Sequence, residues 1–169
     1  MVSIKRHSGI YTLEVKQLVN TSMQEAWEFF STPRNLAKIT PAHMGFQITS
    51  DNVDEMHVGQ IITYQVGILP GIKSSWVTEI THVAPGKFFV DEQRFGPYAM
   101  WHHEHIFEEK EGQVWMTDRV SYKLPFGFLG HLMHGLFIKK QLLGIFNHRF
   151  QTLESYFGEN AKDSLSQSA

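Results

Sequence analysis

The C-terminal third of the chain carries an apolar repeat of helical spacing that is unusually long. It starts after Pro125-Phe126-Gly127, where proline and glycine interrupt the preceding pattern, and continues from Phe128 to Phe157. The positions of the repeat are Leu129, Leu132, Met133, Leu136, Leu143, Phe146, Phe150, Leu153 and Phe157. It predicts one helix of about 30 residues, compared with a mean of about 11–12 residues in globular proteins. Such a helix needs an equally long apolar surface beside it, so we expect an extended, curved sheet along its stripe.

The segments before this helix alternate between apolar and polar residues, which predicts strands. Residues 11–19 form the first strand, and two short helices follow it, one opened by the capping box of Ser22 and Glu25 and one over residues 34–39. Further strands are expected at residues 46–49, 59–68, 74–83, 87–95, 98–109 and 113–124. Short turns join the last four, which makes them an antiparallel meander. The expected fold class is α+β, with a curved antiparallel sheet wrapped around the long helix.

The composition fits one soluble domain and excludes several classes of function. The 169 residues are 42% hydrophobic and 19% charged with a formal net charge of -2, so nothing indicates a nucleic-acid partner. Because there is no cysteine, disulfides, iron–sulfur clusters and thiolate zinc sites are excluded. Residues 1–10 lack the apolar region of a signal peptide, and the uncharged apolar stretch 124–138 is shorter than the ~18 residues of a membrane span. We expect a cytoplasmic protein with an N-terminal extension (1–10), one domain (11–158) and a flexible tail (159–169).

Several residue runs resemble a known superfamily. They are Ile39-Thr40-Pro41, the run from Asp91 to Tyr98, the alternating Trp101, His103, His105 and Phe107, and then Met116, Asp118, Val120, Tyr122, Pro125, Gly127, Gly130, Ile145, Phe146 and Arg149. With the element order, they make residues 11–158 similar to the START-like or Bet v 1-like superfamily (SRPBCC), of the polyketide cyclase/dehydrase and lipid-transport type, and to its bacterial ligand-binding branch. The resemblance implies a helix-grip fold, a cavity for a small hydrophobic ligand and no cofactor. It transfers no catalytic residue, because this fold hosts many functions.

The last hairpin of the meander allows its two faces to be assigned. If Glu111-Gly112 is a two-residue turn, His105 lies opposite Asp118 and Trp101 lies opposite Tyr122. These residues share one face with His103 and with the apolar Phe107 and Met116, because side chains alternate along a strand. We therefore expect His103, His105, Asp118 and Tyr122 to point toward the cavity, with Arg149 of the helix as a second partner for Asp118.

The preceding hairpin, counted from a turn at residues 85–86, adds further inward residues. It pairs Trp76 with Phe95, Thr78 with Gln93, Ile80 with Asp91 and His82 with Phe89. The expected ligand-binding residues are Trp76, Thr78, Asp91, Gln93, Trp101, His103, His105, Asp118, Tyr122, Phe146 and Arg149. The expected ligand is a lipid, quinone, isoprenoid or aromatic polyketide, boxed by the aromatic side chains and anchored by the polar ones.

The polar side chains on this inner face allow other roles. They can form a purely structural network in which His105 pairs with Asp118 and Asp91 caps a backbone group. They can also serve as the general acid and base of a cyclase- or dehydrase-like enzyme. His103, His105 and Asp118 match a two-histidine, one-carboxylate metal triad, but the resemblance calls for no metal and we expect none. A protein-interaction module resembling Hsp90 co-chaperone activators is a further alternative that no residue specifically favours.

The loop over residues 67–72 is apolar, which is unusual for a connection between strands. In helix-grip proteins this loop lies near the cavity mouth, opposite the start of the long helix. We expect a gate formed by Ile68, Leu69, Ile72, Phe126 and Phe128. These residues either pack on one another or act as a lid that touches a membrane surface when a ligand is loaded.

Overall fold

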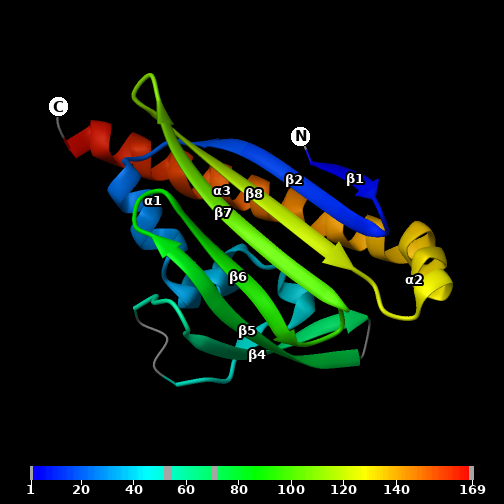
Figure 1. The fold of residues 1–169 in the computed structure, drawn as a ribbon. Helices are drawn as coiled ribbons and strands as arrows, with labels where there is room; N and C mark the ends of the chain where they lie inside the picture. Colours follow the sequence, from blue (N-terminus) through cyan, green and yellow to red (C-terminus); the bar gives the residue numbers. More distant parts are fainter. Residues whose placement is uncertain (1, 52–54, 70–71, 168–169) are drawn as a thin grey trace.

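A computed structural model describes residues 2–51, 55–69 and 72–167, without the side chains of Leu69 and of residues 159–167. A curved antiparallel sheet wraps around a long C-terminal helix (Figure 1). Within the described residues the sheet has eight strands in the order β1-β2-β8-β7-β6-β5-β4-β3. The strands are β1 (Ser3–His7), β2 (Ile10–Val19), β3 (Gln47–Ile48), β4 (Ile61–Leu69), β5 (Ile72–Ala84), β6 (Phe88–Phe95), β7 (Met100–Lys110) and β8 (Gln113–Lys123). The α+β fold class expected from the sequence is confirmed.

The hairpin of β7 and β8 has the predicted register. Glu111 and Gly112 form its turn with φ angles of 55° and 74°, so Lys110 pairs with Gln113. As a consequence His105 lies opposite Asp118 and Trp101 lies opposite Tyr122, as expected. On the outer face Glu104 opposes Arg119, with 3.5 Å between their charged groups. A tight turn with a fixed residue count therefore determined which side chains of these strands face inward.

The hairpin of β5 and β6 departs from the predicted register at both ends. Thr78 pairs with Gln93 and Ile80 with Asp91 as expected, but shifts between Val77 and Thr78 and between Ile80 and His82 change the flanking pairs. Phe95 therefore lies opposite Val77 instead of Trp76, and Phe89 lies opposite Val83 instead of His82. Each bulge adds one residue to one of the two strands. A count that assumes regular one-to-one pairing from the turn cannot detect such an extra residue.

A strand near the N-terminus was not predicted. β1 pairs with β2 through a turn in which Ser8 and Gly9 have φ angles of 50° and 81°. β1 is a short edge strand whose side chains are mostly exposed, so it carries almost no apolar alternation. For this reason residues 3–7 look like an extension in the sequence.

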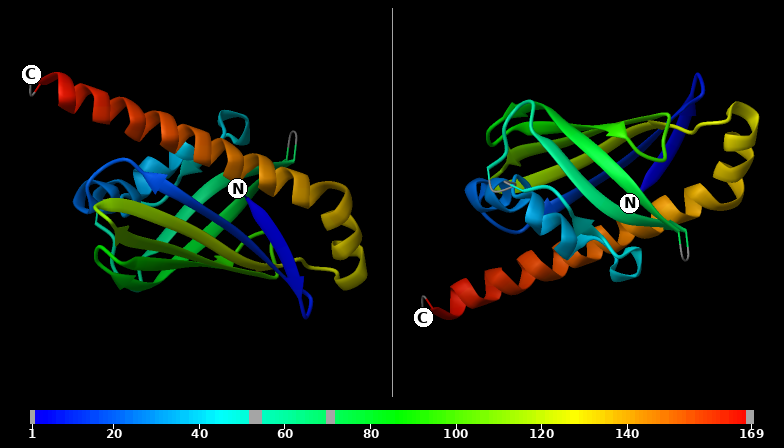
Figure 2. Two further views of the ribbon diagram at one scale, coloured as in Figure 1. Left: turned by 90° about the horizontal axis from the view of Figure 1, so that it is seen from above. Right: turned by 90° about the horizontal axis from the view of Figure 1, so that it is seen from below.

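The predicted short helices lie between β2 and β3. Helix α1 (Met23–Phe30) begins at Ser22, whose hydroxyl accepts from the Glu25 amide while the Glu25 carboxylate accepts from the Ser22 amide. Two 3-10 segments follow, η1 (Pro33–Ile39) and η2 (Ala42–Met44). Figure 2 shows these elements beside the C-terminal half of the long helix. There Phe29 and Phe30 of α1 pack against Phe157, and this apolar cluster closes one end of the molecule.

The C-terminal helix is long, as predicted, but it consists of three parts. They are α2 (Gly127–Met133), the π-helical segment η3 (His134–Ile138) and α3 (Lys139–Gln167). α3 packs on the sheet through a buried stripe that includes Leu142, Phe146 and Leu153. α2 turns away from that line, as Figure 2 shows. Among the described residues, no helix is both long and apolar enough to cross a membrane.

The start of the helical stripe is therefore not packed as expected. Leu129, Leu132 and Leu136 are 57%, 49% and 71% exposed, whereas the prediction placed them against the sheet. The wider π-helical turn changes which residues face the sheet, so Leu142 is buried where the sequence repeat selected Leu143. The continuous helical periodicity of the sequence cannot show where one part of the helix leaves the sheet.

Candidate functional site

A cavity lies between the concave face of the sheet and the C-terminal helix. Its volume is about 420 Å³. Most of its lining is apolar and comes from every layer of the fold. The side chains of this lining include Phe29, Phe30, Ile39, Met44, Phe46, Ile62, Tyr64, Val66, Trp76, Ile80, Phe89, Tyr98, Trp101, Leu142, Ile145 and Phe146.

An aromatic wall occupies one side of the cavity. The Trp76 and Trp101 rings meet edge to face with centroids 5.2 Å apart, and Tyr98 lies 5.6 Å from Trp76 and 4.8 Å from Trp101. Trp76, Trp101 and Phe146 line the cavity as expected, while Tyr98 was not predicted. Tyr98 follows the Gly96-Pro97 turn, so strand alternation gave no indication of its direction.

Tyr122 lies behind this wall and does not line the cavity. Its side chain is fully buried, its ring stacks on Tyr11 at 5.4 Å, and its hydroxyl is 2.8 Å from Nε2 of His134. Gln93 also differs from the expectation. Its amide oxygen accepts from the Tyr98 backbone and its amide nitrogen donates to the Tyr98 carbonyl, so Gln93 fastens the β6–β7 connection. We conclude that both residues support the aromatic wall without facing the cavity.

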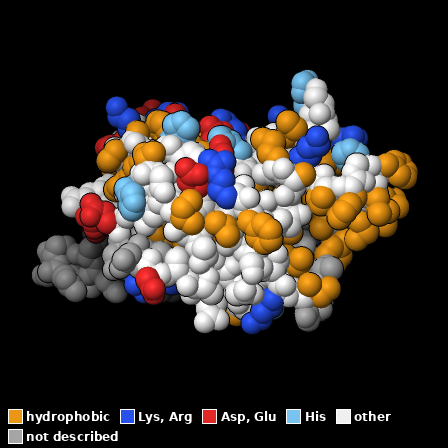
Figure 3. Space-filling model, turned by 60° about the horizontal axis from the view of Figure 1, so that its bottom comes forward, with side chains coloured by type: hydrophobic (Ala, Val, Ile, Leu, Met, Phe, Trp, Pro, Cys, Tyr) orange, Lys and Arg blue, Asp and Glu red, His pale blue; other side chains and the backbone are white. Residues whose placement is uncertain are grey.

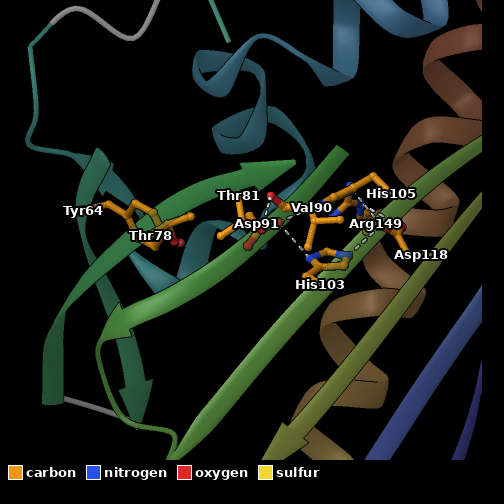
Figure 4. A network of polar contacts seen from close by, with 9 residues as sticks. All are labelled: Tyr64, Thr78, Thr81, Val90, Asp91, His103, His105, Asp118 and Arg149. Carbon is orange, nitrogen blue, oxygen red and sulfur yellow. Dashed lines mark hydrogen bonds and ion pairs between the residues drawn. The ribbon is translucent and has the colours of Figure 1, made fainter. Parts of the chain in front are cut away.

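A group of buried charged residues forms the floor of the cavity. We call Asp91, His103, His105, Asp118 and Arg149 the floor cluster (Figure 4). They come from three neighbouring strands and from α3, and all except Asp118 line the cavity directly. Alternation along β6, β7 and β8 directs the four strand residues inward, and the buried stripe of α3 adds Arg149.

Each histidine of the floor cluster lies between the two carboxylates. Nε2 of His103 is 2.8 Å from Oδ1 of Asp118, and its Nδ1 is 3.4 Å from Oδ2 of Asp91. Nε2 of His105 is 2.8 Å from Oδ2 of Asp91, and its Nδ1 is 3.1 Å from Oδ1 of Asp118. Arg149 Nε lies 3.4 Å from Oδ2 of Asp118. The four groups form a closed ring of alternating imidazoles and carboxylates, with Arg149 beside it.

This arrangement corrects one detail of the expected network. Asp91 was expected, in the purely structural alternative, to cap a backbone group, but its carboxylate contacts both histidines. The well-aligned hydrogen bond of Asp118 is to His103, although His105 is the residue directly opposite it. The side chains reach diagonally across the strand pair, which strand register alone does not determine.

Burial and neighbouring charges act against each other in the floor cluster. Burial favours a higher pKa for Asp118, but Arg149 and the two histidines outweigh it and hold that pKa well below its ordinary value. The histidines lower the pKa of Asp91 in the same way. Burial and the neighbouring imidazole lower the pKa of His103, while contacts with both carboxylates overcome burial and raise the pKa of His105. Attraction between opposite charges therefore keeps both carboxylates ionised although they are buried.

A second polar pair lies on the β4–β5 side of the cavity. The Thr78 hydroxyl is 2.7 Å from the Tyr64 hydroxyl, and both residues line the cavity. Burial and the nearby Asp91 carboxylate raise the pKa of Tyr64, so its hydroxyl stays protonated. Thr78 was expected and Tyr64 was not, although Tyr64 lies on the inward side of its strand. Figure 4 shows this pair facing the floor cluster across β5 and β6.

The predicted gate is only partly assembled. Ile68 and Phe126 line the cavity, and the Gln141 amide donates to the Ile68 carbonyl at 2.8 Å, which ties β4 to the helix. Phe128 and Ile72 are 83% and 51% exposed and do not line the cavity. The Leu69 side chain and Pro70-Gly71 lie outside the described residues.

An exposed apolar surface surrounds this side of the cavity. We call Phe126, Phe128, Leu129, Leu132, Met133 and Leu136 the apolar rim. Figure 3 shows hydrophobic side chains gathered over this end of the molecule. The rim extends from Phe126 through α2 to Leu136 of η3. The start of α2 lies so close to the preceding chain that a Cβ at Gly130 would be 2.2 Å from the Pro125 carbonyl oxygen. Phe126 and Phe128 were predicted as part of the gate. The other four rim residues were predicted only as part of a helical stripe, which is typical of a core.

Comparisons with known proteins identify the fold. No protein-family model and no curated protein match the chain in sequence. Protein Ms6760 from Mycobacterium smegmatis is similar in structure, with 14% identity, a TM-score of 0.65 and coverage of 95% of this chain and 99% of that one.

Two plant proteins are also similar in structure. The ginseng major latex-like protein 151 from Panax ginseng has 14% identity and a TM-score of 0.62, and the Bet v 1-like allergen Ara h 8.0201 has 16% identity and a TM-score of 0.57. Each comparison covers 89% of this chain and 99% of the other. Together with the sheet order and the wrapped helix, these likenesses confirm at the level of fold the resemblance read from the sequence. The chain has a Bet v 1-like helix-grip fold.

Proposed function

We propose that the protein binds and carries one small hydrophobic molecule in the cavity. The observation that carries this proposal is a mostly apolar cavity of about 420 Å³, which falls within the range of about 300–1,000 Å³ typical of small-molecule sites. Burying about 300 Å² of apolar ligand surface at about 25 cal/mol/Å² contributes roughly 7 kcal/mol. The loss of translational and rotational freedom offsets part of this gain, so polar anchors matter for affinity and orientation.

The lining favours a ligand with an apolar body and one polar end. Trp76, Tyr98 and Trp101 offer ring faces and edges to a flat or branched hydrocarbon. Arg149 and the histidines of the floor cluster offer N–H donors to a carbonyl, hydroxyl or carboxylate oxygen. A lipid, a quinone, an isoprenoid and an aromatic polyketide share this chemistry, and the proposal covers this class.

The apolar rim supports exchange of the ligand at a membrane surface. Its six side chains are 42% to 83% exposed, which is unusual for residues that large. Exposed Lys123, Lys139 and Lys140 flank the rim in sequence and provide attraction to anionic lipids. We propose that the rim rests on the lipid surface while a ligand passes the residues around Ile68 and Phe126.

A pair of neighbouring isoleucines in β4 provides a direct test of the proposed cavity. Ile62 faces the cavity and is 5% exposed, whereas Ile61 points outward and is 49% exposed. An Ile62→Trp substitution fills the cavity, so binding of the neutral apolar dye Nile red should weaken at least about tenfold. Ile61→Trp adds the same side chain outside and should leave binding unchanged.

Fluorescence titration measures both affinities, and circular dichroism confirms that both variants remain folded. Val66→Phe, which also adds volume to the cavity lining, gives a second test if Ile62→Trp does not fold. Equal dye binding by the filled and outward-facing variants contradicts the proposal, because the dye then binds elsewhere.

A further inference from the structure

Three residues of the cavity floor bring potential metal ligands together. Asp91 of β6 lies directly opposite His103 of β7, and His105 follows two positions later on the same face. One oxygen or nitrogen of each residue lies within 4.8 Å of the other two. Both Nε2 of His105 and Nδ1 of His103 approach Oδ2 of Asp91, at 2.8 and 3.4 Å.

These spacings suit a metal ion. Metal–ligand bonds of about 2.0–2.2 Å, arranged tetrahedrally or octahedrally, place neighbouring ligand atoms about 3.0–3.5 Å apart. The two contacts of Asp91 lie at or near this range, so small side-chain rotations suffice to enclose an ion. Adjacent hydrogen-bonded strands hold all three residues, which makes the arrangement rigid.

The other nitrogen of each histidine faces a single carboxylate. Nε2 of His103 and Nδ1 of His105 lie 2.8 and 3.1 Å from Oδ1 of Asp118, and Arg149 lies 3.4 Å from the second oxygen of Asp118. Histidines that bind metals commonly donate their remaining N–H to such a carboxylate, which fixes the ring orientation and the tautomer. Nε2 of His105 is hydrogen-bonded to Asp91 at 2.8 Å. A shift of the His105 ring proton to Nδ1, toward Asp118, would leave Nε2 of His105 and Nδ1 of His103 available to an ion beside Asp91.

Two buried nitrogen atoms near this site lack a well-aligned hydrogen-bond partner within the described residues. They are Nδ1 of His105 and Nε of Arg149. Histidines that bind a metal are neutral. In the metal-bound state Asp91, Asp118 and Arg149 therefore sum to one negative charge, which a divalent cation offsets. Binding an ion at Nε2 places the only ring proton of His105 on Nδ1, from which it can be donated to Asp118.

We propose that Asp91, His103 and His105 bind a first-row divalent transition-metal ion such as Zn²⁺ or Fe²⁺ at the cavity floor. Two imidazoles and one carboxylate are a donor set that these ions accept, and the chain has no thiolate to compete. Asp118, supported by Arg149, orients the histidines. A divalent ion and the single negative charge of the surrounding side chains leave one net positive charge. The coordination positions of the ion that face the cavity therefore favour an anionic oxygen, from hydroxide or from a ligand. This site is distinct from the expected triad, because Asp91 takes the place of Asp118.

Metal titration of untagged, chelator-treated protein tests the site without any apolar ligand, so its outcome is independent of the proposed carriage. Isothermal titration with Zn²⁺, and visible absorption of bound Co²⁺, should show one ion per chain. Asp91→Asn and His103→Gln should each weaken binding more than about 100-fold, and Asp118→Asn by about 10–100-fold. His102→Gln is the matched control, because His102 lies next in sequence on the outer face and bonds to Glu92 at 2.9 Å.

The proposal is overturned if wild-type protein binds neither Zn²⁺ nor Co²⁺. It is also overturned if Asp91→Asn and His103→Gln keep wild-type affinity, or if His102→Gln loses it. Circular dichroism checks that each variant folds. Should the variants of the floor cluster not fold, X-ray absorption of zinc-loaded wild type decides the question, because the site requires two imidazole ligands and fewer than two contradict it.

Discussion

The floor cluster and the apolar rim border the same cavity, and they reverse the usual distribution of polarity. The floor cluster places charged and titratable side chains inside, with His103, His105 and Asp118 at most 5% exposed. The rim places large hydrocarbon side chains outside, with Phe126 and Phe128 more than 80% exposed. Charged side chains usually lie in water and large apolar side chains usually lie in the interior, so both regions are exceptions.

The difference between the two regions lies in how each is compensated. In the floor cluster each carboxylate lies within 3.4 Å of both imidazoles, and Asp118 also lies 3.4 Å from Arg149, so part of the cost of burial is offset inside the molecule. The rim side chains lie in solvent on the described surface and gain stabilisation only from a partner outside the chain. The floor should therefore control stability and ligand orientation, whereas the rim should control where the protein binds without affecting how well it folds.

The largest expected effect comes from breaking the floor cluster. Asp118→Ala leaves Arg149 buried without its carboxylate and removes one of the two carboxylates that contact the histidines, so the free energy of unfolding should fall by about 3–5 kcal/mol. The matched change Glu104→Ala removes an outer carboxylate whose partner Arg119 lies 3.5 Å away, and it should cost no more than about 1 kcal/mol. Urea unfolding of chelator-treated protein measures both free energies of unfolding. Similar losses in the two variants would show that the contacts within the floor cluster do not stabilise the fold more than a surface ion pair does.

An intermediate effect is expected from the aromatic wall. Trp76→Ala removes a large contact surface from the cavity, so dye affinity should fall about tenfold, equivalent to about 1.4 kcal/mol. Trp115 lies on the outer face of β8 under the Lys16 side chain, and Trp115→Ala should leave dye affinity unchanged. Fluorescence titration compares the two variants, and an equal loss in both contradicts the assignment of the wall.

The smallest effect on stability is expected from the rim. The double substitution Phe128→Glu with Leu132→Glu places charges on exposed positions, so the free energy of unfolding should change by no more than about 0.5 kcal/mol per substitution. Binding to anionic vesicles of phosphatidylserine and phosphatidylcholine should nevertheless fall at least about tenfold, as measured by cosedimentation. A large loss of stability, or unchanged vesicle binding, would contradict the division of roles between floor and rim.

The fold was predictable because alternation and turns leave few choices. The Glu111-Gly112 turn fixed the β7–β8 register, and with it the inward direction of His103, His105 and Asp118. Strand β1, the bulges in the β5–β6 pair and the π-helical turn could not be predicted, because each changes the residue count or the exposure locally without a pattern of its own.

The candidate site was predictable as a set of residues but not as a geometry. Asp91 meets His103 because β6 and β7 pair in a register set by the irregular connection at residues 96–99, which the sequence does not specify. The diagonal contacts depend on side-chain rotamers. The exposure of Leu129, Leu132, Met133 and Leu136 could not be predicted, because an exposed apolar stripe and a buried one have the same periodicity.

Native mass spectrometry of untagged protein tests the central claim, carriage of a small apolar molecule in the cavity, most directly. A fraction of wild type and of Ile61→Trp should show the added mass of one ligand, and organic extraction should release that ligand. Ile62→Trp should show only the mass of the ligand-free protein. Bare wild-type protein that also fails to bind Nile red would contradict the account, as would an equal added mass on the cavity-filled variant.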